Sequence, residues 1–130
     1  MPPERHPPDS AAEWLNRARS DLALAKSRCD DVYLEDLCFH AQQAVEKAIK
    51  AVFISYKWKF PYIHDLSALL TALLNHGMEI PARIQDCVVL TKFAVEGRYP
   101  GFGEALSEDE YQSSIATAED VMIWVQTIIK

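Results

Sequence analysis

Three polar side chains on one predicted helix have the types and the spacing to bind a ligand. His40, Gln43 and Lys47 stand three and four residues apart within residues 39–51, so an α-helix places them in one stripe. An imidazole, an amide and an ammonium group supply hydrogen-bond donors and one positive charge. In a nucleotide site, His40 and Gln43 would form hydrogen bonds and Lys47 would hold phosphate. A purely structural polar stripe would have the same spacing.

Two other places in the chain carry groups that could complete an anion site. His64 and Asp65 stand at a predicted helix start, where the helix dipole favours a carboxylate. Arg98 and Tyr99 precede a Pro-Gly turn; the arginine fork suits phosphate, and the tyrosine ring offers a stacking face for a base. The predicted ligand-binding residues are His40, Gln43, Lys47, His64, Asp65, Arg98 and Tyr99.

A carboxylate of the chain itself could satisfy these cations instead of a ligand. Buried or half-buried cations need a partner. Asp36, Glu46 and Glu96 are close enough in sequence to serve Lys47 or Arg98. The anion site and the internal ion pair therefore remain alternative interpretations of the same stripe.

The sequence contains no recognisable motif for binding a metal or a cofactor or for activating a nucleophile. The four histidines are widely separated, no glycine-rich phosphate loop follows a strand, and the three cysteines lie far apart. We predict no metal, no cofactor and no catalytic residue. Cys38 and Cys87 fall in helical patterns, where a free cysteine behaves as a small buried hydrophobic residue.

Charge and hydropathy disfavour two classes of protein, those that bind nucleic acid unassisted and those that span a membrane. Nineteen acidic against thirteen basic residues give a net charge of −6, which disfavours unassisted binding of nucleic acid. No apolar run approaches the ~20 residues that span a bilayer. The proline-rich start of the chain does not resemble a signal peptide, so we expect a cytoplasmic protein with no membrane partner.

Helical periodicity runs through almost the whole chain and predicts an all-α fold. Residues 1–9 are expected to form a flexible proline-rich arm, and residues 10–130 a single domain. A seam of small residues, which lets a neighbouring helix approach closely, consists of Ala41, Ala44, Ala48 and Ala51. We expect an up-and-down bundle of five helices, a four-helix core plus a short extra helix, near residues 11–27, 35–56, 64–77, 81–96 and 107–130.

An aromatic-rich segment follows the second predicted helix. It contains Tyr56, Trp58, Phe60 and Tyr62, broken by Pro61. The rings are too dense in this stretch for a five-helix core to absorb them fully. Exposed apolar patches usually mark interfaces, so the segment supports a homodimer.

Three ordered motifs make the chain resemble the HEPN family, the higher eukaryotes and prokaryotes nucleotide-binding domain. They are FHAQQAVEKAIKA at residues 39–51, HDL at residues 64–66 and RYPG at residues 98–101. The resemblance covers nearly the whole chain from residue 11 to residue 130 and is typical of the small stand-alone prokaryotic type.

The resemblance implies a five-helix bundle that forms a homodimer. Small prokaryotic proteins of this kind are often paired with a minimal nucleotidyltransferase in toxin–antitoxin-like modules. Many HEPN proteins are metal-independent ribonucleases in which an arginine is followed, after four to six residues, by a histidine. No arginine here has a histidine at that spacing. The departure favours a non-catalytic module that binds a nucleotide, a nucleotidyltransferase or both.

Two other functions fit the same sequence. One is a ribonuclease toxin with a displaced pair, for instance Arg98 with His40 or His64. The other is a structural dimer without a ligand, in which the polar stripe only sets the register of the helices.

Overall fold

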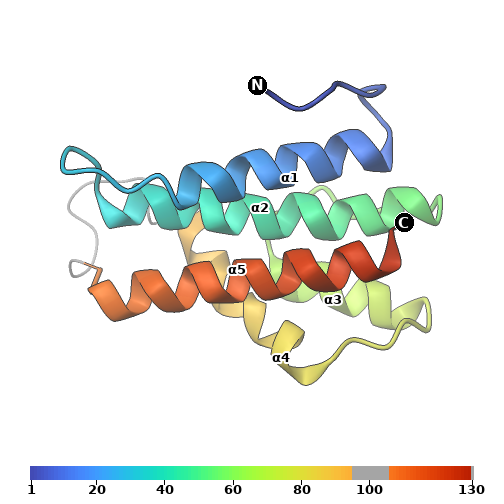
Figure 1. The fold of residues 1–130 in the computed structure, drawn as a ribbon. Helices are drawn as coiled ribbons and strands as arrows, with labels where there is room; N and C mark the ends of the chain where they lie inside the picture. Colours follow the sequence, from blue (N-terminus) through green and yellow to red (C-terminus); the bar gives the residue numbers. More distant parts are fainter. Residues whose placement is uncertain (95–105, 130) are drawn as a thin grey trace.

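The computed structural model describes residues 1–94 and 106–129, and helices are the only regular secondary structure in these ranges. Figure 1 shows the long helices packed side by side. The predicted all-α fold with five α-helices is confirmed for the described residues. The elements are α1 (Ala11–Ala25), α2 (Leu34–Ser55), α3 (Leu66–Asn75), α4 (Ala82–Gln85), the 3₁₀ helix η1 (Asp86–Ala94) and α5 (Glu108–Ile128).

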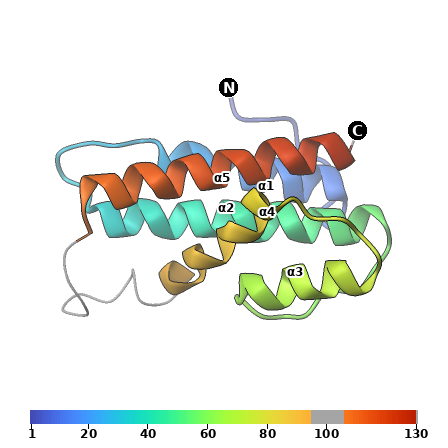
Figure 2. The same cartoon turned by 90° about the horizontal axis from the view of Figure 1, so that it is seen from below.

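Helix α2 lies at the centre of the bundle and contacts α1, α3, α5 and η1. Helix α1 runs antiparallel to α2, whereas α5 begins at the same end as α2 (Figures 1 and 2). The seam of alanines predicted from the sequence is fully buried, with at most 1% exposure at any of its four positions. Small side chains on this face allow the close packing that a central helix needs.

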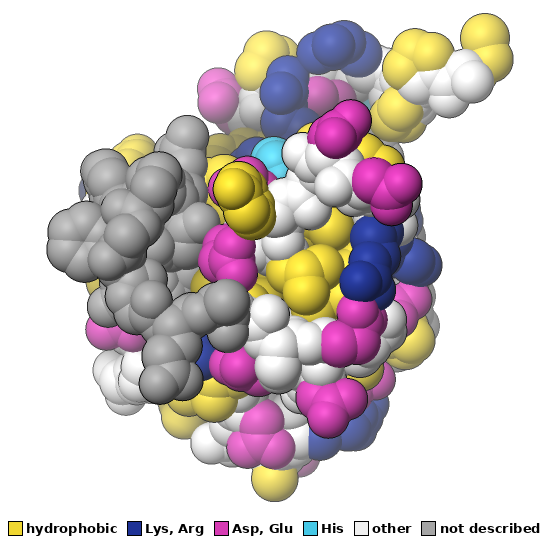
Figure 3. Space-filling view, turned by 90° about the vertical axis from the view of Figure 1, so that its left-hand side faces the viewer, with side chains coloured by type: hydrophobic (Ala, Val, Ile, Leu, Met, Phe, Trp, Pro, Cys, Tyr) yellow, Lys and Arg dark blue, Asp and Glu magenta, His cyan; other side chains and the backbone are white. Residues whose placement is uncertain are grey.

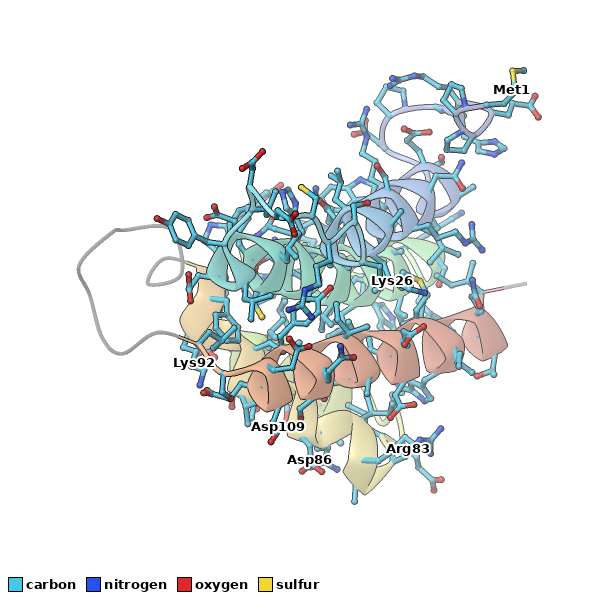
Figure 4. The ribbon with its side chains drawn as sticks, turned by 60° about the vertical axis from the view of Figure 1, so that its left-hand side comes forward. Met1, Lys26, Arg83, Asp86, Lys92 and Asp109 are labelled. Carbon is cyan, nitrogen blue, oxygen red and sulfur yellow. The ribbon has the colours of Figure 1, made fainter. Side chains whose placement is uncertain are left out.

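Two ion pairs connect the C-terminal end of α1 to α5. Lys26 lies beside α5 in Figure 4, and its Nζ is 3.1 Å from Oε2 of Glu119. Arg28 donates to Glu108 at the start of α5 over 2.6 Å. Each of the four side chains is about half exposed, so the two pairs add little stability and mainly fix how α1 lies against α5.

The fourth predicted helix differs from the expectation. It was expected to continue from Pro81 to about residue 96, but it is α-helical only over Ala82–Gln85 and then becomes the 3₁₀ helix η1. The buried residues of this stretch are spaced by three, which matches a helix with three residues per turn. They are Ile84, Cys87, Leu90 and Phe93.

Helices α2 and α3 end in the same type of C-cap but with different residues. In α3 the left-handed position is Gly77, with φ +87°. In α2 the same position is Lys57, with φ +60°. Trp58 N–H donates to Phe53 O over 2.9 Å and Lys57 N–H to Ile54 O over 3.0 Å, as in a Schellman motif. A left-handed conformation costs a residue other than glycine about 1 kcal/mol, so Lys57 is a strained choice.

The N-terminal arm makes contacts with α1. Asn16 Nδ2 donates to Glu4 O over 3.0 Å, and His6 N–H donates to Glu13 Oε1 over 3.0 Å. The Glu13 carboxylate also holds Arg17 on the same helix at 3.1 Å. The flexibility of residues 1–9 stays a prediction.

Two of the three thiols are buried, as predicted. Burial raises the pKa of Cys38 to about 11 and that of Cys87 to about 12, so both remain protonated and inert near neutral pH. Cys29 is exposed in the connection between α1 and α2. Among the described residues, no helix is long and apolar enough to cross a membrane.

Candidate functional site

Helix α2 carries two polar networks, and the first one joins it to α1. In this Asp21 cluster, Lys47 Nζ lies 2.6 Å from Asp21 Oδ2, and His40 Nδ1 lies 3.1 Å from Asp21 Oδ1. Asp21 projects from α1 and is buried, while the side chains of His40 and Lys47 are 33% and 29% exposed. One carboxylate therefore holds an imidazole and an ammonium group at the edge of the α1–α2 junction.

The geometry of the Asp21 cluster leaves donors and acceptors unused. The ammonium group of Lys47 has three N–H donors, and one of them donates to Asp21. When His40 donates Nδ1–H to Asp21, its Nε2 is an acceptor without a partner in residues 1–94 and 106–129. The cluster can thus offer further hydrogen bonds to a ligand at its exposed edge.

The second network lies deeper and surrounds Glu46. Glu46 accepts from Gln42 over 2.9 Å, from Lys50 over 2.9 Å and from His64 Nδ1 over 2.9 Å. Gln43 joins it indirectly, because its Nε2 donates to Gln42 Oε1 over 2.7 Å. We call these five residues the Glu46 network. Glu46 and Lys50 are both buried, so the pair is an ion pair inside the fold.

Burial and hydrogen bonding act on Glu46 in opposite directions. Burial raises the pKa of the Glu46 carboxyl, but the hydrogen bonds from Lys50, Gln42 and His64 outweigh it and leave the pKa lowered. The carboxylate is therefore ionised at neutral pH and pairs with a charged Lys50. His64 covers the pair from the α2–α3 connection and is itself mostly exposed.

The comparisons with known proteins agree with the resemblance seen in the sequence. The family model of the HEPN domain matches residues 11–128. The chain belongs to the HEPN domain family. The crystal structure of TT1696 from Thermus thermophilus has a TM-score of 0.80 to this HEPN protein and 25% sequence identity, over 92% of this chain and 98% of that one.

A second solved structure is similar to this HEPN protein. ST0689, described as an archaeal HEPN homologue, has a TM-score of 0.74 and 27% identity, over 93% of this chain and 98% of that one. No curated protein sequence matches the chain significantly.

The HEPN fold distributes the predicted site residues over more than one place. His40 and Lys47 come together at Asp21, while Gln43 and His64 belong to the Glu46 network. Asp65 caps α3, because its Oδ1 accepts from Ser67 N–H over 3.0 Å. Arg98 and Tyr99 lie outside the described residues. Among the described residues of this HEPN protein, no group of His, Cys, Asp and Glu gathers as a metal site would.

The counter-ion of Lys47 was missed by sequence reasoning. Asp36, Glu46 and Glu96 were the expected candidates, but Lys47 pairs with Asp21, on the preceding helix. A signal was present, because Asp21 lies on the apolar face of α1 between Ala18 and Ala25. A carboxylate on a buried face needs a cation or donors from the helix that packs against it.

Proposed function

We propose that this HEPN protein is a non-catalytic binding module whose ligand is a nucleotide. The observation that carries the proposal is the Asp21 cluster, which holds a partly exposed Lys47 and His40 on one carboxylate. The unused N–H donors of Lys47 suit the oxygens of a phosphate, and the free ring nitrogen of His40 can accept from an N–H of a nucleobase. Charge-assisted hydrogen bonds to a phosphate are worth about 1.5–3 kcal/mol each.

The second half of the proposed site comes from the RYPG motif. Arg98 supplies a second phosphate-binding cation and Tyr99 a ring that stacks on the base. Asp21 competes with phosphate for Lys47, because its carboxylate already accepts one N–H. We therefore expect most of the binding free energy to come from Arg98 and from the unused donors of Lys47.

Calorimetric titration with ATP and other nucleotides tests this site. We expect Arg98→Ala to weaken binding roughly tenfold or more, because one charge-assisted contact is lost. Asp21→Asn should tighten binding, because it removes the carboxylate that competes for Lys47. Lys26→Gln, which removes a half-exposed charge at the C-cap of α1, is the matched control. Absence of nucleotide binding at millimolar concentration would leave the Asp21 cluster a purely structural device.

We also propose a homodimer and a minimal nucleotidyltransferase as the partners of this module, in a toxin–antitoxin-like pair. Membership of the HEPN family supports both partners. The ring of Tyr62, 93% exposed, supports an interface at the aromatic segment.

One observation favours ribonuclease activity as a second candidate. The Asp21 carboxylate accepts from Nδ1 of His40 and so orients the ring, while Nε2 of His40 stays free to take a proton. Carboxylates orient general-base histidines in the same way. Because no arginine has a histidine at the family spacing, we expect purified protein without metal to leave a mixed RNA substrate intact. Cleavage that His40→Ala abolishes would establish the ribonuclease and overturn the non-catalytic proposal.

A further inference from the structure

A column of stacked rings stands at the C-terminal end of α2. Trp58 lies between Tyr56, with ring centroids 4.5 Å apart and planes at 14°, and His76, with centroids 4.0 Å apart and planes at 4°. Buried Phe53 contacts Trp58, Phe60 and His76 edge-on and holds the column in place. The column is therefore preorganised, and half-exposed Tyr56 forms one of its ends.

Two lysines alternate with these rings and have no counter-ion. Lys57 and Lys59 are exposed, and neither ammonium group has an ion pair or hydrogen bond in residues 1–94 and 106–129. Residues 56–64 contain no Asp or Glu. This stretch is locally basic in a chain whose net charge is −6.

Lys57 stands where the backbone favours glycine. Its φ of +60° is left-handed, and the equivalent C-cap of α3 uses Gly77. Local strain of this kind is often retained at functional sites. A lysine at this position keeps a cation next to the ring column in the sequence, at the expense of backbone stability.

A group of acidic residues lies at the other end of the bundle. Figure 3 views that end, where α2 and α5 begin, and several acidic side chains are exposed on it beside hydrophobic and basic ones. The acidic ones among the described residues are Asp30, Asp31, Glu35, Asp36, Glu108, Asp109 and Glu110. These carboxylates would repel an anion bound at the ring column only weakly, because the Debye length is about 8 Å at physiological salt and the two ends of the bundle are farther apart than that.

We propose that the aromatic–lysine surface (Tyr56, Lys57, Trp58, Lys59 and His76) binds single-stranded nucleic acid. A single strand offers what this surface complements: flat bases for the exposed Tyr56 end of the column and phosphates for the two free ammonium groups. A duplex hides its bases, and a mononucleotide would use only part of the surface. This site is separate from the Asp21 cluster and does not depend on the proposed nucleotide site.

Fluorescence anisotropy of a labelled oligothymidylate of about 10 nucleotides tests the proposal. At low salt the wild type should bind the single strand more tightly than a duplex of equal length. Tyr56→Ala should weaken binding about tenfold, because one stacking contact is lost. Lys57→Gly should also weaken binding and reduce the slope of log affinity against log salt by about 0.7.

Lys57→Gly separates binding from folding. It relieves the left-handed strain, so its denaturation midpoint should rise while its affinity for the oligonucleotide falls. Two control variants should leave binding unchanged. They are Tyr33→Ala, at an exposed tyrosine before the start of α2, and Lys26→Gln, an equal loss of charge at the C-cap of α1.

Three results would overturn the proposal. The first is no oligonucleotide binding at low salt. The second is binding that Tyr56→Ala does not affect and that inorganic polyphosphate displaces as well as the oligonucleotide does, since charge alone would then explain it. The third is a dimer in sedimentation equilibrium that Tyr56→Ala dissociates without any change in oligonucleotide affinity, which would make this face an interface between two copies.

Discussion

Glu46→Gln is expected to lower the free energy of unfolding by about 3–5 kcal/mol. The substitution keeps the size of the side chain but removes the charge that buried Lys50 pairs with at 2.9 Å. An ammonium group left without a counter-ion inside the fold retains its full desolvation cost. Phe60 lies 5.3 Å from Lys50 Nζ and its ring face offsets only part of this cost.

Urea denaturation of Glu46→Gln beside Glu119→Gln measures this effect. Both substitutions break a Glu–Lys pair, but Glu119 and Lys26 are about half exposed, so Glu119→Gln should change stability far less. Equal destabilisation by the two variants would contradict the buried ion pair.

The Glu46 network also predicts how stability depends on pH. The pKa of Glu46 is lowered in the fold, so the folded protein releases this proton more readily than the unfolded chain. Its contribution is fully present above the ordinary pKa of a glutamate, about 4.3, and is lost as the pH falls through the lower folded value. Glu46→Gln should lack this part of the acid-induced loss of stability.

Phe53→Ala is expected to lower the free energy of unfolding by about 3–5 kcal/mol. Phe53 has 0% exposure and contacts Trp58, Phe60 and His76, so its loss leaves a cavity under the ring column. The C-cap of α2 should loosen as well, because the contact between Phe53 and Trp58 accompanies its Schellman hydrogen bonds.

Denaturation of Phe53→Ala beside Tyr62→Ala checks this prediction. Tyr62 is an aromatic residue of the same segment but is 93% exposed, so its truncation should be nearly neutral. The near-ultraviolet circular dichroism of Phe53→Ala should also change, because Trp58 loses its fixed surroundings. A variant as stable as the wild type would show that Phe53 does not support the column.

Much of the fold could be predicted from the sequence because helical spacing reports directly on burial. The alanines of residues 39–51 repeat every three or four positions, and all of them are buried against neighbouring helices. The boundary between α4 and η1 could not be predicted, since apolar residues spaced by three fit both kinds of helix.

The candidate site was predicted only in part because spacing identifies a face of a helix but not the partner on the next helix. His40, Gln43 and Lys47 share one stripe of α2, yet Asp21 holds only the first and the last of them. Gln43 turns instead to its neighbour Gln42. The left-handed backbone of Lys57 could not be predicted either, because a glycine usually indicates such a position and the residue here is a lysine.

The most direct test of the proposed nucleotide site is the NMR spectrum of the histidine rings during titration with ATP. The four histidines report on separate places: His40 on the Asp21 cluster, His64 on the Glu46 network, His76 on the ring column and His6 on the N-terminal arm. If the Asp21 cluster binds nucleotide, the His40 signals move with a saturable dependence on ATP while those of His64 and His6 stay in place. His40 signals that remain unmoved at millimolar ATP would contradict the proposed site.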